Sequence, residues 1–567
     1  MEMTARSYRP PKLGAIKTMN AESILAGLDP EQLEVVTNVR GPVCVIAGAG
    51  TGKTRVITHR IAYAIATGVA DPNKTLALTF TARAAGEMRA RLRTLGVPNA
   101  AARTFHSAAL KQLMYFWPYS FGGSFPKLLT SKAGFMSEAM GRSDTTLVPG
   151  VATLREISGE IEWAKSMETS PSDYVEAALA ANRSLRIPNG RSHKDNYFEI
   201  AKVYQSYETL KHQERVIDFE DVLLLTVGML EEDKDVRERV RDQYRYFTVD
   251  EYQDVSPLQQ RLLNLWLGNR DDICVVGDAA QTIYSFAGAT SSFLLGFTHR
   301  FPQSAVIRLN RGYRSTPEII SMANSVLKLS REGSHQELIS MNERGEELDL
   351  RGFTDSRAEV AAVVERIAAL NNSHSDIAIL ARTNAQLDPF EQALKARNIE
   401  TQLKSSERFF DRVEVKDAMR TIRSASVLPC EGDWVIELSS VLRPFGDGDY
   451  VRAFIALAQE IKSNGTDGPN ALRAFLRELE DRAEQNNPPT LPGVVLSTLH
   501  AAKGLEWDQV FLVGINEGSL PYGRADISST QLEEERRLFY VGITRAKSAA
   551  HLSYSGTPSL FLEGLVK

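Results

Sequence analysis

Short apolar runs alternate with longer amphipathic stretches along most of the chain. A short apolar run followed by a stretch of helical periodicity is typical of the strand–helix units that build parallel sheets. The expected strands are residues 43–47, 75–79, 247–250, 273–277, 305–309, 376–381, 494–498 and 510–513. The pattern therefore predicts an α/β fold with parallel sheets.

Two long segments lack this alternation. Residues 109–215 are polar and helical in pattern, and they include the aromatic residues Tyr115, Phe116, Trp117 and Tyr119. Residues 420–490 are also helical in pattern, with turns rich in glycine, asparagine and proline. We expect both segments to be helical insertions into α/β domains.

Composition sets limits on the fold and on the binding partners. A chain of 567 residues exceeds what one hydrophobic core usually holds, so several domains are expected. The net charge of −5 gives no general attraction to a polyanion. Any nucleic-acid site must therefore gather its positive charge in a groove.

The three cysteines, Cys44, Cys274 and Cys430, form no CxxC pair, so no zinc or iron–sulfur site is expected. Cys44 and Cys274 lie in apolar runs and are predicted to be core residues of a protein from a reducing compartment. The basic N-terminal segment 6–17 lacks the apolar region of a signal peptide, and no stretch is long enough to span a membrane. We expect a soluble, cytoplasmic protein.

The segment AGAGTGKT, residues 47–54, follows an apolar strand and begins a helix. This context is typical of a phosphate-binding loop, in which glycines let successive N–H groups face the phosphates. Lys53 is expected to reach the β and γ phosphates, and Thr54 to bind Mg²⁺. Ala47 stands where the strict pattern has glycine, so an ordinary glycine turn is the alternative.

The segment VDEYQD, residues 249–254, ends another apolar strand. Asp250 is placed to bind Mg²⁺, and Glu251 is placed to polarise an attacking water molecule. A solvated acidic turn is the alternative for this motif alone. Together with the upstream loop, it predicts an ATP or GTP hydrolase.

A longer series of motifs runs in order along the chain: LDPEQ, AGAGTGKT, TFTARAAGEM, TFHS, DFED, VDEYQD, VVGDAAQTIYSF, LNRGYRS, ARTNAQ, STLHAAKGLEW and VGITRAK. The series, from residue 28 to 547, resembles the UvrD/Rep/PcrA-like superfamily 1A DNA helicases. Details such as EIEWAK and QTIYSF resemble the shorter actinobacterial branch of that family.

The resemblance implies two RecA-like motor domains, each with a mainly helical inserted subdomain. The first motor domain would comprise residues 1–108 and 216–298 around the insertion 109–215. The second would comprise residues 299–419 and 491–567 around a shortened insertion, 420–490.

The resemblance also implies a set of ATP contacts. Gln32, Arg55 and Tyr313 would contact the adenine, Glu506 the ribose, and Gln281 the γ-phosphate. Arg314 and Arg545 would be arginine fingers supplied by the second motor domain. The loop contacts would be Ala47, Gly48, Ala49, Gly50, Thr51, Gly52, Lys53 and Thr54. The expected catalytic residues are Lys53, Glu251, Gln281, Arg314 and Arg545.

For the DNA strand, the resemblance implies contacts by Phe80, His106, Tyr284, Phe286, Arg382 and Asn384. For each aromatic residue taken alone, core packing is the better interpretation. The family usually has tryptophan at the position of Phe286, and arginine at the positions of Ser285 and Ala287. These departures predict a weaker stacking contact and less positive charge along the strand.

The implied activity is ATP-driven 3′ to 5′ movement along single-stranded DNA, with unwinding of tailed duplexes, in repair or replication at the bacterial nucleoid. The shortened second insertion favours an alternative, a translocase that displaces proteins and unwinds little on its own. A non-catalytic DNA-binding scaffold would need a degenerate nucleotide site, and the intact Lys53, Asp250 and Glu251 argue against it. An RNA motor stays open from the residues alone, because stacking and phosphate contacts suit both polymers.

Overall fold

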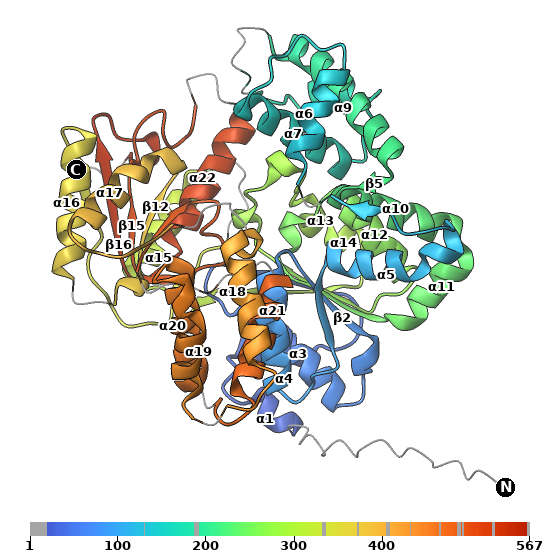
Figure 1. The fold of residues 1–567 in the computed structure, drawn as a ribbon, viewed down its shortest axis with the longest axis horizontal. Helices are drawn as coiled ribbons and strands as arrows, with labels where there is room; N and C mark the ends of the chain where they lie inside the picture. Colours follow the sequence, from blue (N-terminus) through green and yellow to red (C-terminus); the bar gives the residue numbers. More distant parts are fainter. Residues whose placement is uncertain are drawn as a thin grey trace.

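The computed structural model describes residues 20–563 except 130, 186, 188–191, 331–335, 371–372, 404–408, 431, 464–465, 485–488, 490–492 and 524–527. The basic N-terminal segment lies outside these residues. Two parallel six-stranded sheets, with helices packed against them, form the body of the molecule (Figure 1). This confirms the α/β fold expected from the sequence.

The first sheet has the strand order β3-β2-β6-β7-β1-β8, and all its strand pairs are parallel. Side chains of one strand point alternately to two cores: Leu76 and Leu78 belong to one, and Ala77 to the other. Its strands are β1 (Val43–Ala47), β2 (Thr75–Thr79), β3 (Ala101–Thr104), β6 (Tyr246–Val249), β7 (Ile273–Gly277) and β8 (Ala305–Leu309).

The second sheet has the order β11-β16-β15-β12-β14-β13, again with parallel pairs throughout. Its strands are β11 (Asp349–Phe353), β12 (Ile377–Ala381), β13 (Thr401–Leu403), β14 (Val494–Thr498), β15 (Trp507–Leu512) and β16 (Ala546–Ser555). Helices α15 (Pro317–Lys328) and α22 (Ser529–Ile543) pack against each other and contribute to the same core.

Helical segments occupy both predicted insertions. The first contains α6 (Ala133–Arg142), α7 (Val151–Ser166), α8 (Tyr174–Ala180) and α9 (His193–Glu214), which share one core. The second begins before its expected start at residue 420: α18 (Val413–Ala425) shares one core with α19 (Trp434–Leu442), α20 (Asp449–Ser463) and α21 (Ala471–Glu484), around Trp434, Phe454 and Phe475. Among the helices described, none is long and apolar enough to cross a membrane.

Two further expected boundaries differ from the structure. Strand β8 lies in the range assigned to the second motor domain, yet it pairs with β1 at the edge of the first sheet. Helix α5 (Phe105–Ser120) crosses the expected start of the first insertion at residue 109 and packs against α10 (Phe219–Glu232), in the core of the first sheet. In both cases tertiary packing decides an assignment that local pattern leaves open.

A buried ionic network joins the first insertion to the first sheet's helices. The Asp218 carboxylate accepts hydrogen bonds from the Lys165 and Lys211 ammonium groups, at 2.7 and 2.8 Å. Asp221 also pairs with both lysines. All but Asp221 are almost fully buried. Burial alone would raise the pKa of Asp218, but the lysines outweigh it and hold that pKa well below its ordinary value.

Replacing Asp218 by alanine should cost about 3–5 kcal/mol of unfolding free energy, because it leaves two buried ammonium groups without their main partner. Urea denaturation followed by tryptophan fluorescence would measure this loss. The matched control is Glu87→Ala, since Glu87 forms an exposed ion pair with Arg83 and should cost below about 1 kcal/mol.

The stabilising contribution of Asp218 is present above its unfolded pKa, about 3.9, and is lost as the pH falls through the folded pKa. The difference between wild type and Asp218→Asn should therefore stay constant from pH 7 to 5 and shrink only at lower pH. Equal losses for the Asp218 and Glu87 variants at pH 7 would contradict the proposed role of the network.

Candidate active site

The loop 47–54 connects the end of β1 to helix α3 (Lys53–Ala66). Gly50 and Gly52 have φ of +73° and +84°, values that favour glycine. A Cβ on Gly50 would also lie only 2.8 Å from the Cβ of Arg314. The part of the molecule built on the first sheet is called the first half below, and the part built on the second sheet the second half. The glycines therefore permit both the tight turn and the close approach of Arg314, from the second half. The turn leaves N–H groups at a helix N-terminus, where anionic phosphates bind well.

Hydrogen bonds within and around the loop fix its shape. The Thr51 hydroxyl donates to the Gly48 carbonyl at 3.0 Å, and the Lys53 ammonium donates to the Ala47 carbonyl at 3.3 Å. Gln32 is buried, and its side-chain nitrogen donates to the Thr51 carbonyl at 3.1 Å. Gln32 therefore supports the loop backbone, a role that its expected contact with adenine did not indicate.

Two adjacent carboxylates follow β6. Glu251 has a φ of +51°, an uncommon conformation for a side-chain-bearing residue and one that occurs preferentially at functional sites. Its N–H donates to Asp250 Oδ1 at 3.0 Å, and its carboxylate accepts a 2.5 Å hydrogen bond from Gln253. The strained turn therefore directs two neighbouring carboxylates to different partners.

The two carboxylates differ in charge. Burial, together with the adjacent Glu251 charge, raises the pKa of Asp250. Burial also acts on Glu251, but the charges of Lys53 and Lys503 and the Gln253 hydrogen bond outweigh it and lower the Glu251 pKa. Glu251 is therefore the ionised member, suited to accept a proton or to orient water.

The residues present fit a magnesium–nucleotide complex. A divalent cation beside Asp250 would favour the charged carboxylate, which burial otherwise opposes. Thr54, the second residue of α3, adds a hydroxyl oxygen of the kind that Mg²⁺ accepts as a ligand. Lys53 and the loop N–H groups supply positive potential for phosphates.

Arg314 lies in the second half of the molecule, close to the loop. Its Nε forms a 2.6 Å ion pair with Glu506, and its terminal nitrogen donates to the Thr544 carbonyl at 3.2 Å. Glu506 also pairs with Lys547 at 3.1 Å. Burial alone would raise the pKa of Glu506. The positive charges of Arg314 and Lys547 have the larger effect, so this pKa lies below its ordinary value. Glu506 therefore holds Arg314 in place, in addition to its expected ribose contact.

Arg545 follows the end of α22 and is almost fully buried. Its guanidinium donates to the Val541 carbonyl at 2.9 Å and the Leu505 carbonyl at 3.2 Å. Burial and the nearby charge of Arg314 lower its pKa to about 9, so Arg545 stays positively charged at neutral pH. Its charge also acts on Glu251 in the first half. The two expected arginine fingers therefore lie near each other, and Arg545 lies near Glu251.

Contacts from the second half reach directly onto the first. The Lys503 ammonium forms a 2.5 Å ion pair with Asp254 and donates to the Gln281 carbonyl at 2.6 Å. The Gln281 side chain donates to Asp278 Oδ2 at 2.7 Å. Asp254, Asp278 and Lys503 were not predicted as site residues. All three lie inside quoted motifs, so their position in the motifs was the available signal.

Tyr313 also connects the two halves. Its N–H donates to the Gly50 carbonyl at 2.9 Å, and its hydroxyl donates to Asp29 at 2.5 Å. Arg55, the third residue of α3, donates to the Gly27 carbonyl at 3.0 Å.

Arg55 borders a cavity of about 400 Å³ between α3 and α4 (Ala82–Thr94). The cavity is lined by Arg55, Thr58, His59, Ala90, Arg91, Thr94 and Leu95. Space for a planar base therefore exists beside Arg55, on the same helix that begins at Lys53.

Four rings, Phe80, Tyr284, Phe286 and His500, form a continuous group that we call the aromatic group. Phe80 stacks on Tyr284 with centroids 5.2 Å apart, and Phe286 meets His500 edge-on at 5.8 Å. Tyr284 also contacts Phe286 and His500. Phe80 is 41% exposed and Phe286 52%. Exposed aromatic faces of this kind suit stacking on nucleic-acid bases. His500 was not predicted.

The other expected strand contacts lie elsewhere. Burial lowers the pKa of His106 to about 4, so this residue is neutral at pH 7. Arg382 is engaged by Glu535 through both ends of its guanidinium, at 2.7 and 3.0 Å. Asn384 is exposed at the start of a short 3-10 helix. Within the described part of the chain, none of the three makes a hydrogen bond or ring contact with the aromatic group.

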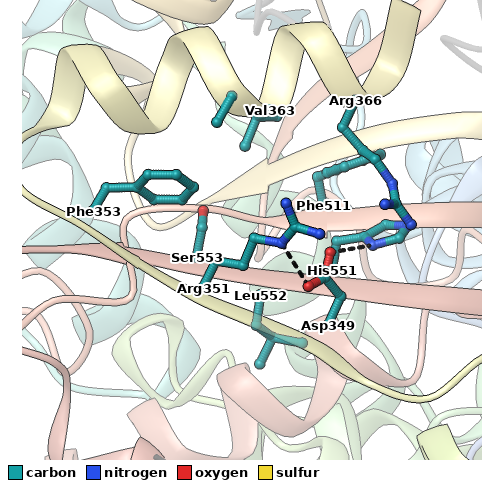
Figure 2. Close-up of a pocket in the computed structure, with 10 residues that line it drawn as sticks. Asp349, Arg351, Phe353, Val363, Arg366, Phe511, His551, Leu552 and Ser553 are labelled. Atoms are coloured by element: carbon teal, nitrogen blue, oxygen red, sulfur yellow. Dashed lines mark hydrogen bonds and ion pairs between the residues drawn. The ribbon is translucent and has the colours of Figure 1, made fainter. Parts of the chain in front are cut away.

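A separate small cavity lies between α16 (Ser356–Ala369) and strands β11, β15 and β16 of the second sheet (Figure 2). Asp349 pairs there with Arg351 and with His551, which stacks on Phe511. Its volume of about 20 Å³ admits no more than a water molecule. This cavity therefore offers no second ligand site.

Comparison with known proteins agrees with this geometry. The UvrD/REP helicase N-terminal domain model matches residues 28–302, and the UvrD-like helicase C-terminal domain model matches residues 307–426 and 448–557. The ATP-dependent DNA helicase UvrD2 of Mycobacterium tuberculosis H37Rv is 44% identical over 586 residues, which cover 96% of this chain and 82% of the relative.

More distant relatives include the ATP-dependent DNA helicases PcrA of Leuconostoc citreum and Bacillus subtilis. Each is 28% identical, and the alignments cover 94% and 95% of this chain and 83% and 84% of the relatives. The first family model covers the strands of the first sheet up to β7, and the second covers the strands of the second sheet. With these matches, the loop, the paired carboxylates and the facing arginines place the chain in the UvrD/Rep helicase family.

Proposed function

We propose that this protein is an ATP-dependent DNA helicase that moves 3′ to 5′ along single-stranded DNA and unwinds tailed duplexes. One observation carries the proposal: Lys503 of the second half contacts the aromatic group and also the turn at residues 249–254 of the first half, which contains Asp250 and Glu251. It pairs with Asp254 and lies 5.0 Å above the Tyr284 ring. One side chain therefore links the proposed ATP site to the proposed strand contact. The names of the relatives support DNA as the substrate.

The chemistry follows from the charges of the site. Loop N–H groups and Lys53 bind the triphosphate, and Thr54 and Asp250 would hold Mg²⁺, which neutralises phosphate charge when bound. Glu251 orients the attacking water and accepts its proton. Arg314 and Arg545 offset the charge that develops on the γ-phosphate, and Gln281 contacts the same group.

Hydrolysis is tied to movement because the charged groups come from both halves. The arginines act only when the second half closes on the loop, so each turnover requires closing and opening of the cleft. The exposed rings of the aromatic group change position with the same motion and advance the strand by stacking. The setting we propose is DNA repair or replication in the bacterial cytosol.

A second candidate is a translocase that strips proteins from single strands and unwinds little by itself. The small second insertion favours it, because four α-helices (α18–α21) and two short 3-10 helices are the only helices described between β13 and β14. We infer that so few elements offer a duplex little surface to grip.

Replacing Lys53 by alanine, or Glu251 by glutamine, should abolish ATP turnover. We expect at least a 10²-fold fall in kcat for Glu251→Gln, the lower end of the range for a lost general base. Nucleotide affinity should be kept in Glu251→Gln, because its role begins after binding.

Steady-state hydrolysis with DNA and equilibrium binding of a fluorescent ATP analogue would test both variants. Glu391→Gln is the matched control, since Glu391 pairs with Lys395 on the surface of α17 (Asp388–Ala396). Normal hydrolysis by either Lys53→Ala or Glu251→Gln would refute the site assignment.

Arg314→Ala should lower kcat by roughly 10³-fold or more while the Kd for ATP changes far less, because a finger acts on charge that develops in the transition state. Arg314→Lys should recover little, since the lysine cannot keep both the Glu506 and Thr544 contacts. Single-turnover hydrolysis separates this loss from weaker binding. An equal change in Kd and kcat/KM would instead indicate a binding role.

Unwinding of 3′-tailed and 5′-tailed duplexes with ATP tests activity, polarity and autonomy together. We expect strand separation only with the 3′ tail. Strong DNA-stimulated ATP hydrolysis without separation of either duplex would favour the protein-displacing translocase. Preference for the 5′ tail would overturn the proposed polarity, and stronger stimulation by RNA than by matched DNA would overturn the substrate.

A further inference from the structure

The exposed ring of Phe286 stands on a tightly held backbone. Residues Ser285–Ala287 form a short 3-10 turn, η4, and Gly288 follows with a φ of +91°. A Cβ on Gly288 would lie 3.0 Å from the Cβ of Ser166, so the turn packs directly against the end of α7. The ring is thus presented to solvent while its backbone is packed against the first insertion.

On one side, this turn is fixed by hydrogen bonds to a residue of the second half of the molecule. The Ser285 N–H donates to Glu534 Oε1 at 3.1 Å, and the Ser285 hydroxyl donates to the other oxygen of the same carboxylate. Glu534 lies in the second turn of α22 and is half-buried. Hydrogen bonds to an ionised carboxylate are stronger than those between neutral groups, and two of them fix both distance and direction.

On the other side, the same turn is fixed by a hydrogen bond from the first insertion. The Arg183 guanidinium donates to the Phe286 carbonyl at 3.0 Å. Arg183 is itself fixed by a 2.6 Å ion pair with the buried Glu160 and lies 4.5 Å above the Trp163 ring. The carbonyl of Phe286 is therefore anchored to the rigid core of the first insertion, while the preceding residue is bound to α22.

Helix α22 continues from this turn to the nucleotide site. Arg537, one turn after Glu534, donates to the Thr282 carbonyl at 2.9 Å. Arg545 follows the end of the helix and acts on Glu251. At 1.5 Å per residue, Glu534 lies roughly 14 Å along the helix from Ile543, its last residue, which is two residues before Arg545. A rigid helix transmits a displacement at Arg545 to Glu534 with little loss.

We propose that Glu534 is a positioning residue that transmits closure of the nucleotide cleft to Phe286. When α22 moves, the carboxylate pulls Ser285, while Arg183 retains the Phe286 carbonyl, so the turn between them rotates and reorients the ring. The inference rests on the proposed function, in which nucleotide binding and hydrolysis drive that closure. It also gives Ser285 a role, where the family usually has arginine.

The pair of hydrogen bonds from Ser285 to Glu534, which we call the clamp, is tested by amide hydrogen exchange. This measurement requires neither ATP nor DNA. In Glu534→Gln and Glu534→Ala, the Ser285 amide should exchange roughly tenfold faster, as expected for loss of a hydrogen bond to a charged group. Amides of the buried strand β7 should keep their protection, which excludes general unfolding. Glu517→Gln, an exposed acidic residue of the same half, is the charge-matched control. Unchanged exchange at Ser285 would overturn the clamp.

Coupling is tested by the ATP hydrolysed per nucleotide travelled on single-stranded DNA. Glu534→Gln should slow translocation more than hydrolysis, so this ratio should rise several-fold, while Glu517→Gln keeps the wild-type ratio. Ser285→Ala should raise the ratio in the same direction, and the double variant should be less impaired than the sum of the two, because both remove one interaction.

Faster Ser285 exchange with an unchanged ratio would show a merely structural contact and overturn the proposal. Additive effects of Glu534→Gln and Ser285→Ala on this ratio would also overturn the proposal. Failure of the wild-type protein to translocate would contradict the proposed function and, with it, the coupling role. The exchange result for the clamp would stand by itself, so the two failures are distinguishable.

Discussion

A buried ammonium group at the meeting edge of the two sheets is the contact on which the rest of the site depends. The side chain of Lys503 is 7% exposed, and that of its partner Asp254 is fully buried. Burial raises the pKa of Asp254 to about 6 even with Lys503 beside it. Two such charges are tolerated in the interior only when they face each other, so this ion pair is a contact specific to the juxtaposed halves. The contacts that Tyr313 makes with Gly50 and Asp29 require the same juxtaposition.

Five strands, β1, β2, β7, β8 and β14, were expected at their observed bounds. Four of them lie inside their sheets, where buried parallel strands are continuous apolar runs, and the fifth, β8, lies at an edge. Strand β16 was missed, since its alanines, serines and lysine carry little apolar signal although most of it is buried. Edge strands such as β3 and β13 are short and partly polar, so only pairing reveals them.

The structure gathers the residues expected at the nucleotide site more completely than those expected along the strand. Its residues lie in compact motifs whose spacing reflects one loop or one turn, as in 47–54 and at Asp250 and Glu251. The partners of those residues come from distant segments, and no local pattern shows that Lys503 meets Asp254 or that Glu506 holds Arg314. For the same reason the engagement of Arg382 by Glu535 could be found only in three dimensions.

The position of β8 has a further consequence. Because β8 closes the first sheet and all strands of the second sheet come later in the chain, the backbone passes from one sheet to the other once. That passage begins at residues 310–316, between β8 and α15, a helix that already packs in the core of the second sheet. It includes Tyr313 and Arg314, so the covalent connection between the two sheets is also part of the proposed ligand contact. A torsional change in this connection would act close to the bound phosphates and far from the outer parts of the second half.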